Sequence, residues 1–197
     1  MVVSGWCLTS RAVSTANHYQ HLFNTILPYR FVQRNRNRTG GRASWLYEDI
    51  YKFFIHSPDS RRKYLVEVHA YPDHLYTVDF YAKVHDVNRY RLRTNQRAMG
   101  RLGGTVLSIL AGIVRADPEA RFGFLAAAMM HETSDVRTKR FKIYVKMFEL
   151  KLNSARHKVL VRPENSSIFV MPVAVAADTS LQRAIIQRYE RIFAETF

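Results

Sequence analysis

The segment KYLVEVHAYPDHLYTVDFYAKV, residues 63–84, alternates apolar and polar side chains on either side of the turn-forming sequence YPDH. Alternation with a period of two is typical of strands with one buried face, so the segment predicts an antiparallel hairpin. Pairing the apolar residues of the two strands places Glu67 beside Asp79 on the other face, with His69 near Thr77. The apolar face comprises Tyr64, Val66, Val68 and Ala70 on the first strand and Tyr76, Val78, Phe80, Ala82 and Val84 on the second.

Helices are predicted before this hairpin, and helices alternate with strands after it. STANHYQHLFNTIL (residues 14–27), which Pro28 ends, and ASWLYEDIYKFFIH (residues 43–56) both show apolar residues at helical spacing. The rest of the chain predicts a helix at 106–114, a strand at 121–128, a helix at about 136–152, strands at 157–161 and 167–175, and a closing helix at 180–193.

This order predicts a single α+β domain over residues 1–197, with a mixed, mostly antiparallel sheet flanked by helices. Residues 1–60 are expected to form a helical part that packs on a sheet-containing part, residues 61–197. The lone cysteine, Cys7, excludes an intramolecular disulfide and a cysteine metal site, which favours a reducing, cytoplasmic location. No apolar run approaches the roughly 20 residues of a membrane span, and no secretory signal is recognisable at the start, so no membrane partner is expected.

Charge is the most unusual property of the composition. Thirty lysines and arginines against 16 acidic residues give a net charge of +14, with a pI near 10.2. Such a field attracts polyanions, and arginine suits forked contacts with phosphate. A genome whose codons favour arginine is the alternative explanation.

Two arginine-rich stretches without acids concentrate this charge. They are RFVQRNRNRTGGR (residues 30–42) and NRYRLRTNQRAMGRLGG (residues 88–104), and each carries five arginines. The first is expected in an exposed connection between two helices. Runs of like charge are often solvated loops, but two of them, with a lysine-lined helix face, favour phosphate contact. The predicted nucleic-acid-binding residues are Arg34, Arg36, Arg38, Arg42, Arg89, Arg91, Arg93, Arg97, Arg101, Lys139, Lys142 and Lys146.

A second group combines acids and histidines around the hairpin. Glu67 and Asp79 oppose each other, with His69 and His85 nearby in sequence. Opposed carboxylates repel unless a cation lies between them. A divalent metal would suggest metal-assisted nuclease chemistry, but a basic side chain is the simpler cation. We therefore predict no metal site.

The sequence QRAMGRLGGTVLSIL (residues 96–110) places glycines at the start of a helix, where free amides can bind an anion. It resembles the Gln/Arg-x-x-Gly-x-Gly/Ala signature of GNAT-type acyltransferases, with Leu102 in place of the small residue. The resemblance covers about residues 78–173. It implies a GNAT-like fold, acetyl-CoA bound by Arg97, Gly100, Arg101, Gly103 and Gly104, and Tyr144 as the acid that protonates the leaving thiolate. GTVLSIL, RFGFLAA and RFKIYVKM also resemble small uncharacterised α+β proteins of phages and mobile elements.

Three functions follow, and the sequence favours the first. A basic protein would bind nucleic acid, RNA or DNA, through the arginine-rich loops without a cofactor. Alternatively, a GNAT-like acyltransferase would use acyl-CoA, on an RNA or protein substrate. The third function is that of an interaction protein whose basic face docks an acidic partner. The sequence leaves the oligomeric state open.

Overall fold

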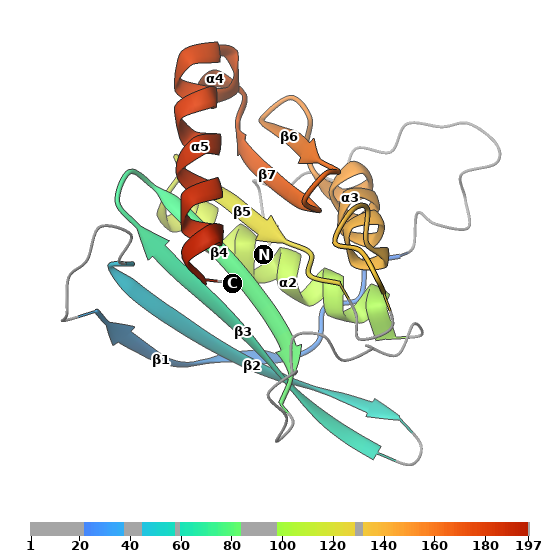
Figure 1. Ribbon diagram of the computed structural model, residues 1–197. Coiled ribbons are helices and arrows are strands. Elements are labelled where there is room, and N and C mark those ends of the chain that lie inside the picture. Colours follow the sequence, from blue (N-terminus) through green and yellow to red (C-terminus); the bar gives the residue numbers. More distant parts are fainter. Residues whose placement is uncertain (1–21, 38–44, 58–59, 84–97, 129–131, 197) are drawn as a thin grey trace.

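The computed structural model describes residues 22–37, 45–57, 60–83, 98–128 and 132–196. Within these ranges the fold is α+β, with four helices flanking a mixed, mostly antiparallel sheet of seven strands (Figure 1). The strands are β1 (Tyr29–Arg36), β2 (Tyr47–Ser57), β3 (Ser60–Tyr71), β4 (Leu75–Ala82), β5 (Arg121–Leu125), β6 (His157–Arg162) and β7 (Ser167–Pro172). The helices are α2 (Met99–Ala116), α3 (Lys139–Lys151), α4 (Val173–Ala177) and α5 (Thr179–Thr196).

The sheet order is β1-β2-β3-β4-β5-β7-β6. The first four strands form an antiparallel meander, β4 and β5 are parallel, and β5, β7 and β6 continue antiparallel. The parallel pair needs a crossover connection, which α2 provides. The predicted fold class is confirmed.

The β3–β4 hairpin has the predicted register. Glu67 lies opposite Asp79, and His69 lies opposite Thr77. Val66 and Val68 are buried on the other face, as the alternation predicts. Val84 and His85 lie outside the described residues.

The helices predicted at 14–27 and 43–56 are wrong wherever the structure describes those residues. Residues 22–28 are not helical, and β1 and β2 are neighbouring strands of the sheet. Residues 30–36 of the first arginine-rich stretch therefore form an edge strand rather than a loop between helices. The apolar residues of β2 fit a helical stripe by spacing, but Phe53 and Ile55 are buried on one face of a strand.

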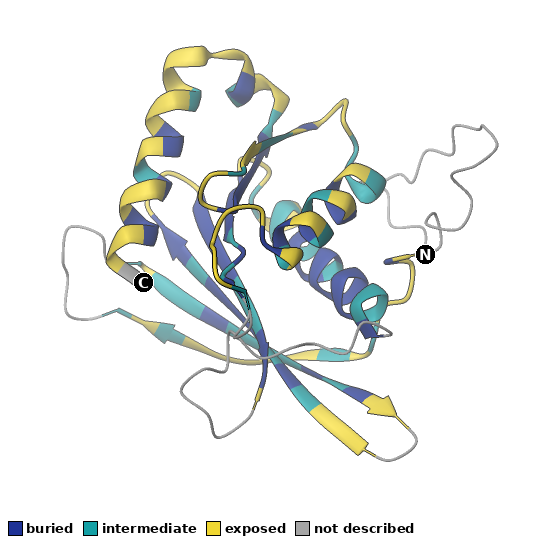
Figure 2. Ribbon diagram, turned by 45° about the vertical axis from the view of Figure 1, so that its right-hand side comes forward, coloured by how far each residue is buried: buried dark blue, intermediate teal, exposed yellow. Residues whose placement is uncertain are grey.

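Two apolar layers cover the two faces of the sheet. α2 and α3 pack on one face through residues such as Leu102, Val106 and Phe148. α5 packs on the other face, where Tyr189 meets Phe169 of β7. Figure 2 shows buried residues on the sides of α2 and α5 that meet the sheet. By length and composition α2 could cross a membrane, but its buried residues are part of this core.

The C-terminal elements follow the predicted order, but the strand predicted at 121–128 ends at Leu125 and the helix predicted from about residue 136 begins at Lys139. Thr138 caps α3, and its hydroxyl accepts a bond from the Phe141 N–H at 3.1 Å. The strand predicted at 167–175 ends at Pro172, and the short helix α4 follows. Proline lacks the N–H that a strand ladder requires, which explains the early end.

Candidate functional site

β4 and β5 are the only parallel neighbours among the strands that the structure describes, and their pairing is short. The pairs are Leu75 with Arg121, Tyr76 with Phe122 and Thr77 with Gly123. Beyond them β4 continues to Ala82, whereas β5 pairs only with β7 and ends at Leu125. Ligands of open sheets bind outside the carboxyl ends of parallel strands, which makes this divergence the first place to examine.

Tyr189 of α5 holds the amino ends of this strand pair together. Its hydroxyl accepts from the Tyr76 N–H at 3.2 Å and donates to the carbonyl oxygen of Arg121. Gly123 leaves space for the ring, since a Cβ there would lie 2.5 Å from the Tyr189 Cδ1 atom. One buried side chain thus ties β4 to β5 before they diverge.

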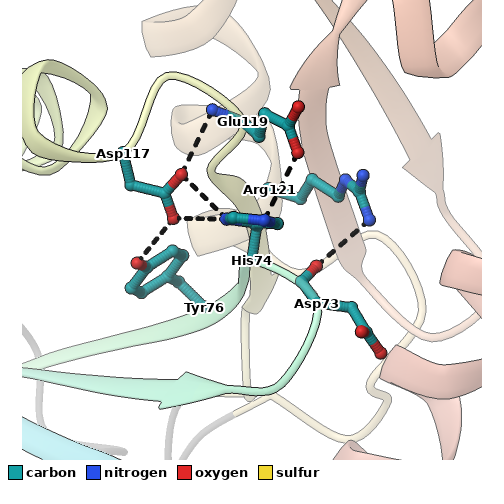
Figure 3. Close-up of polar contacts among 6 residues, drawn as sticks. All are labelled: Asp73, His74, Tyr76, Asp117, Glu119 and Arg121. Atoms are coloured by element: carbon teal, nitrogen blue, oxygen red, sulfur yellow. Dashed lines mark hydrogen bonds and ion pairs between the residues drawn. The ribbon is translucent and has the colours of Figure 1, made fainter.

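A polar cluster around His74 reinforces the same end (Figure 3). His74 Nδ1 lies 2.9 Å from Asp117 Oδ1, and His74 Nε2 lies 3.3 Å from Glu119 Oε2. Tyr76 donates its hydroxyl hydrogen to Asp117 at 2.8 Å. A histidine between carboxylates can assist a nucleophile, but no serine, threonine or cysteine of the described residues bonds to this one. The cluster therefore connects the β3–β4 turn to the loop after α2.

A pocket lies at the opposite, diverging end, and we call it the β4–β5 pocket. Its cavity volume is about 20 Å³, enough for a water molecule, within a wider hollow of about 330 Å³ that includes open solvent. Its lining residues come from β4, the end of β5 and α3: Val78, Asp79, Phe80, Leu125, Ala127, Arg140 and Tyr144.

Tyr144 brings the most distinctive chemistry to this pocket. Its side chain is only 7% exposed, and its ring lies 5.2 Å from the ring of Phe80. No described residue forms a hydrogen bond with its hydroxyl, and Tyr144 is one of the residues that line the pocket. Burial raises the pKa of Tyr144 to about 12, while the charge of Arg140 acts in the opposite direction. The group is therefore a neutral hydrogen-bond donor at ordinary pH.

Asp79 is also among the lining residues, and Glu67 opposes it on β3, on the sheet face opposite to that of Val78 and Phe80. Glu67 is buried and accepts a bond from the hydroxyl of Tyr81. His69 Nε2 lies 3.2 Å from Glu48 Oε1. In the part of the chain that the structure describes, no three acidic, histidine or cysteine side chains are grouped as a metal would require. Of this group, Asp79 is the residue that lines the pocket.

The start of α2 follows β4 in the chain and has the features of an anion site. Its N-terminal residue Ala98 provides no capping side chain, and no acidic residue occupies the first turn. The first backbone N–H groups of a helix lack partners, and its dipole favours negative charge there. Gly100 and Arg101 lie in this first turn.

Gly103 and Gly104 lie one turn further on, where helix bonds normally occupy the amides. A Cβ on Gly103 would lie 2.4 Å from the Phe23 ring, and one on Gly104 would lie 2.4 Å from the Thr25 carbonyl oxygen. The Leu27 N–H also donates to Thr105 Oγ1 of α2 at 2.9 Å. These glycines allow the segment before β1 to cross closely over α2.

Arg34 and Arg36 both lie on β1. Their partners in the ladder lie on the face of β2 that points to the core, so the two arginines are on that side of the sheet. Arg34 is paired: its guanidinium binds both carboxylate oxygens of Asp49 at 2.7 and 2.8 Å and stacks on Tyr47 at 3.8 Å. The Asp49 hydrogen bond raises the pKa of Arg34 above its usual range. Arg34 therefore stabilises the sheet edge, whereas Arg36 is exposed.

The other predicted basic residues are distributed over separate elements. Lys139, Lys142 and Lys146 are exposed on α3, which packs on the β5–β7 side of the sheet, away from β1 (Figure 1). Arg101 lies at the start of α2. Arg38, Arg42, Arg89, Arg91, Arg93 and Arg97 lie outside the described residues. The described members lie on three different elements, β1, α2 and α3.

Sequence reasoning missed Arg140 as a site residue. It precedes Tyr144 by four positions, so the two share a face of α3. That spacing was available in the sequence. Asp79 was predicted as a neighbour of Glu67, but its place in a pocket depends on β5, which is distant in the chain.

Comparison with known proteins gives no family for this chain. No protein family matches it, and neither curated proteins nor solved structures include a significant match.

The buried tyrosines predict a loss of stability in alkali. Burial raises the pKa of Tyr144 to about 12 and that of Tyr189 further, whereas an unfolded tyrosine titrates near 10. Because the folded pKa values are raised, this stability is complete below pH 10 and is lost as pH rises from 10 towards 12. Each such group should reduce the free energy of unfolding by up to about 1.4 kcal/mol per pH unit in that interval. Urea denaturation at pH 8 to 11 measures this slope, and Tyr144→Phe should make it shallower; equal slopes would contradict the assignment.

Proposed function

We propose that the protein is an acyl-CoA-dependent acyltransferase whose thioester lies in the β4–β5 pocket. The observation that carries this proposal is a largely buried tyrosine, Tyr144, which lines a pocket at the carboxyl ends of two diverging parallel strands and whose hydroxyl bonds to no described residue. The start of α2, which has no acidic residue in its first turn, follows the first of those strands.

The chemistry of coenzyme A suits these three features. Its pantetheine arm carries amides, which can pair with backbone groups that diverging strands leave unused. Its pyrophosphate suits the first turn of α2, where the amides of Gly100 and Arg101 and the Arg101 guanidinium supply donors and positive charge. The thioester is then directed into the pocket that Tyr144 lines.

Each pocket side chain has a role in this reaction. The acceptor's nucleophile attacks the thioester carbonyl carbon, its proton passes to Asp79, and the carbon–sulfur bond breaks. Tyr144 donates its hydroxyl hydrogen to the leaving sulfur. Arg140 lowers the pKa of Tyr144 relative to burial alone, which eases that donation.

The resemblance to GNAT-type acyltransferases supports the same proposal. The order of β4, α2, β5 and α3 is the strand, helix, strand and helix order that the resemblance implies. Leu102, which departs from the signature, is the fourth residue of α2, and its side chain is buried in the core. The departure therefore leaves the first-turn amides unchanged.

Reversing the charge of Arg101 tests the cofactor site without weakening the helix. Arg101→Glu places an acid in the first turn, which the helix dipole favours, yet it repels a pyrophosphate. Acetyl-CoA affinity measured by calorimetry should fall at least tenfold, which corresponds to about 1.4 kcal/mol. Arg115→Glu, in the last turn of the same helix, is the matched control and should bind like the wild type. Equal affinity in all three proteins, or no binding by the wild type, would exclude this cofactor site.

A further inference from the structure

Four basic residues lie on the sheet face opposite α2 and α3, and we call them the basic sheet face: Arg30, Lys52, Lys63 and Lys83. Arg30 and Lys52 are direct partners in the β1–β2 ladder. Lys52 pairs with Leu65, which shares a strand face with Lys63 two residues away. Lys83 follows β4, and its N–H donates to the Lys63 carbonyl oxygen at 2.9 Å. The four residues come from four successive strands.

No carboxylate of the described residues forms an ion pair with any of these four side chains. Like charges directly opposite each other in a ladder destabilise it. Consistent with this crowding, the pKa of Lys63 is lowered, first by partial burial and then by Lys83, Lys52 and Arg30. A bound polyanion would relieve this repulsion.

An aromatic platform lies beside the basic sheet face. Phe54 is partly exposed and shares a strand face with Lys52. The guanidinium carbon of Arg61 lies 3.9 Å from the centre of the Phe54 ring. The ends of β2 and β3 that carry these residues project beyond the rest of the sheet (Figures 1 and 2). Phosphate contacts beside an aromatic ring are the pattern of single-stranded nucleic-acid binding.

We infer that the basic sheet face binds the phosphate backbone of single-stranded nucleic acid, with a base on Phe54. Four strands span three spacings of about 4.8 Å, roughly 14 Å. This width allows more than one phosphate of a single strand to contact the four side chains. Apart from Arg30, which begins the first arginine-rich stretch, the four residues lie outside both arginine-rich stretches, and the inference does not depend on acyl transfer.

Two matched triple variants test the inference by fluorescence anisotropy with a labelled 12-nucleotide RNA and its DNA counterpart, without coenzyme A. The first is Lys52→Ala with Lys63→Ala and Lys83→Ala. The second removes the same charge from α3 through Lys139→Ala, Lys142→Ala and Lys146→Ala. Each lost contact to single-stranded phosphate should lower the salt slope by about 0.7, so the first triple should bind about 100-fold more weakly at 0.1 M salt. The α3 triple should keep the wild-type slope.

The other outcomes overturn the inference. Equal loss in both triples would show that only the general positive field matters, and no loss in either would place binding elsewhere. Tighter binding of polyglutamate than of the oligonucleotide, abolished by the first triple, would assign the surface to an acidic protein.

The first triple should melt at or above the wild-type temperature, because repulsion is removed. Acetyl-CoA affinity, measured separately, reports on the proposed enzyme and not on this surface.

Discussion

Tyr144→Phe is expected to lower kcat for acyl transfer by about 100-fold to 10,000-fold, the usual contribution of a positioned acid. The substitution removes only a hydroxyl that no described residue bonds. The ring contact with Phe80 remains, so the fold should be retained. Acetyl-CoA affinity should change little, because the hydroxyl acts on the leaving sulfur rather than on the pyrophosphate. Steady-state release of free thiol from acetyl-CoA measures kcat directly.

The control for this variant is a second buried tyrosine that does not line the pocket. Tyr64 of β3 stacks on Phe53 with ring centres 5.5 Å apart, and Tyr64→Phe should leave kcat unchanged. The wild-type rate should also fall only above about pH 10, as the raised pKa of Tyr144 keeps its hydroxyl protonated below that. A Tyr144→Phe protein with wild-type kcat would remove the tyrosine from the mechanism.

Gly104→Ala is expected to lower the free energy of unfolding by about 1–3 kcal/mol, the usual penalty of overpacking. The new Cβ would lie 2.4 Å from the Thr25 carbonyl oxygen and 2.6 Å from that of Phe23. Both are backbone atoms, so the segment before β1 must move away from α2. Urea denaturation compares the variant with the wild type.

Gly112→Ala provides a control of opposite sign in the same helix. A Cβ there meets only the Arg115 Nη2 atom at 3.8 Å. Alanine in a helix interior is favoured over glycine by roughly 0.5–1 kcal/mol, so this variant should be more stable. If Gly104→Ala also proved stabilising, the close crossing of α2 by the N-terminal segment would be incorrect.

The hairpin and its register could be predicted because the information is local. Alternation over residues 64–84 determines which side chains share a face, and a short turn determines the pairing of Glu67 with Asp79. The helix at α2 and its end near Asp117 were likewise determined by local periodicity and by Pro118.

The sequence did not predict β2 as a strand because a charged residue interrupts the apolar side chains on its core-facing side. Asp49 occupies a buried position on the same face as Phe53 and Ile55. It is tolerated there because Arg34 of β1 neutralises it. Such a partner comes from a distant part of the chain, so a helical stripe fitted the local pattern better.

The candidate site was only partly accessible from the sequence. Tyr144 was predicted through the acyltransferase resemblance, and the structure places it on the β4–β5 pocket. The divergence of β4 from β5 depends on pairing between segments more than 40 residues apart, with Tyr189 tying them from still further away. The basic sheet face likewise results from the ladder rather than from any run of charge.

Hydrogen–deuterium exchange with and without acetyl-CoA tests the central claim, that acyl-CoA lies between the diverging strands. The proposed site predicts increased protection at residues 78–82 of β4, at residues 125–128 after β5 and in the first turn of α2. Exchange in β6 and at the projecting ends of β2 and β3 should stay unchanged. Protection confined to those projecting ends, or no change with saturating acetyl-CoA, would contradict the account.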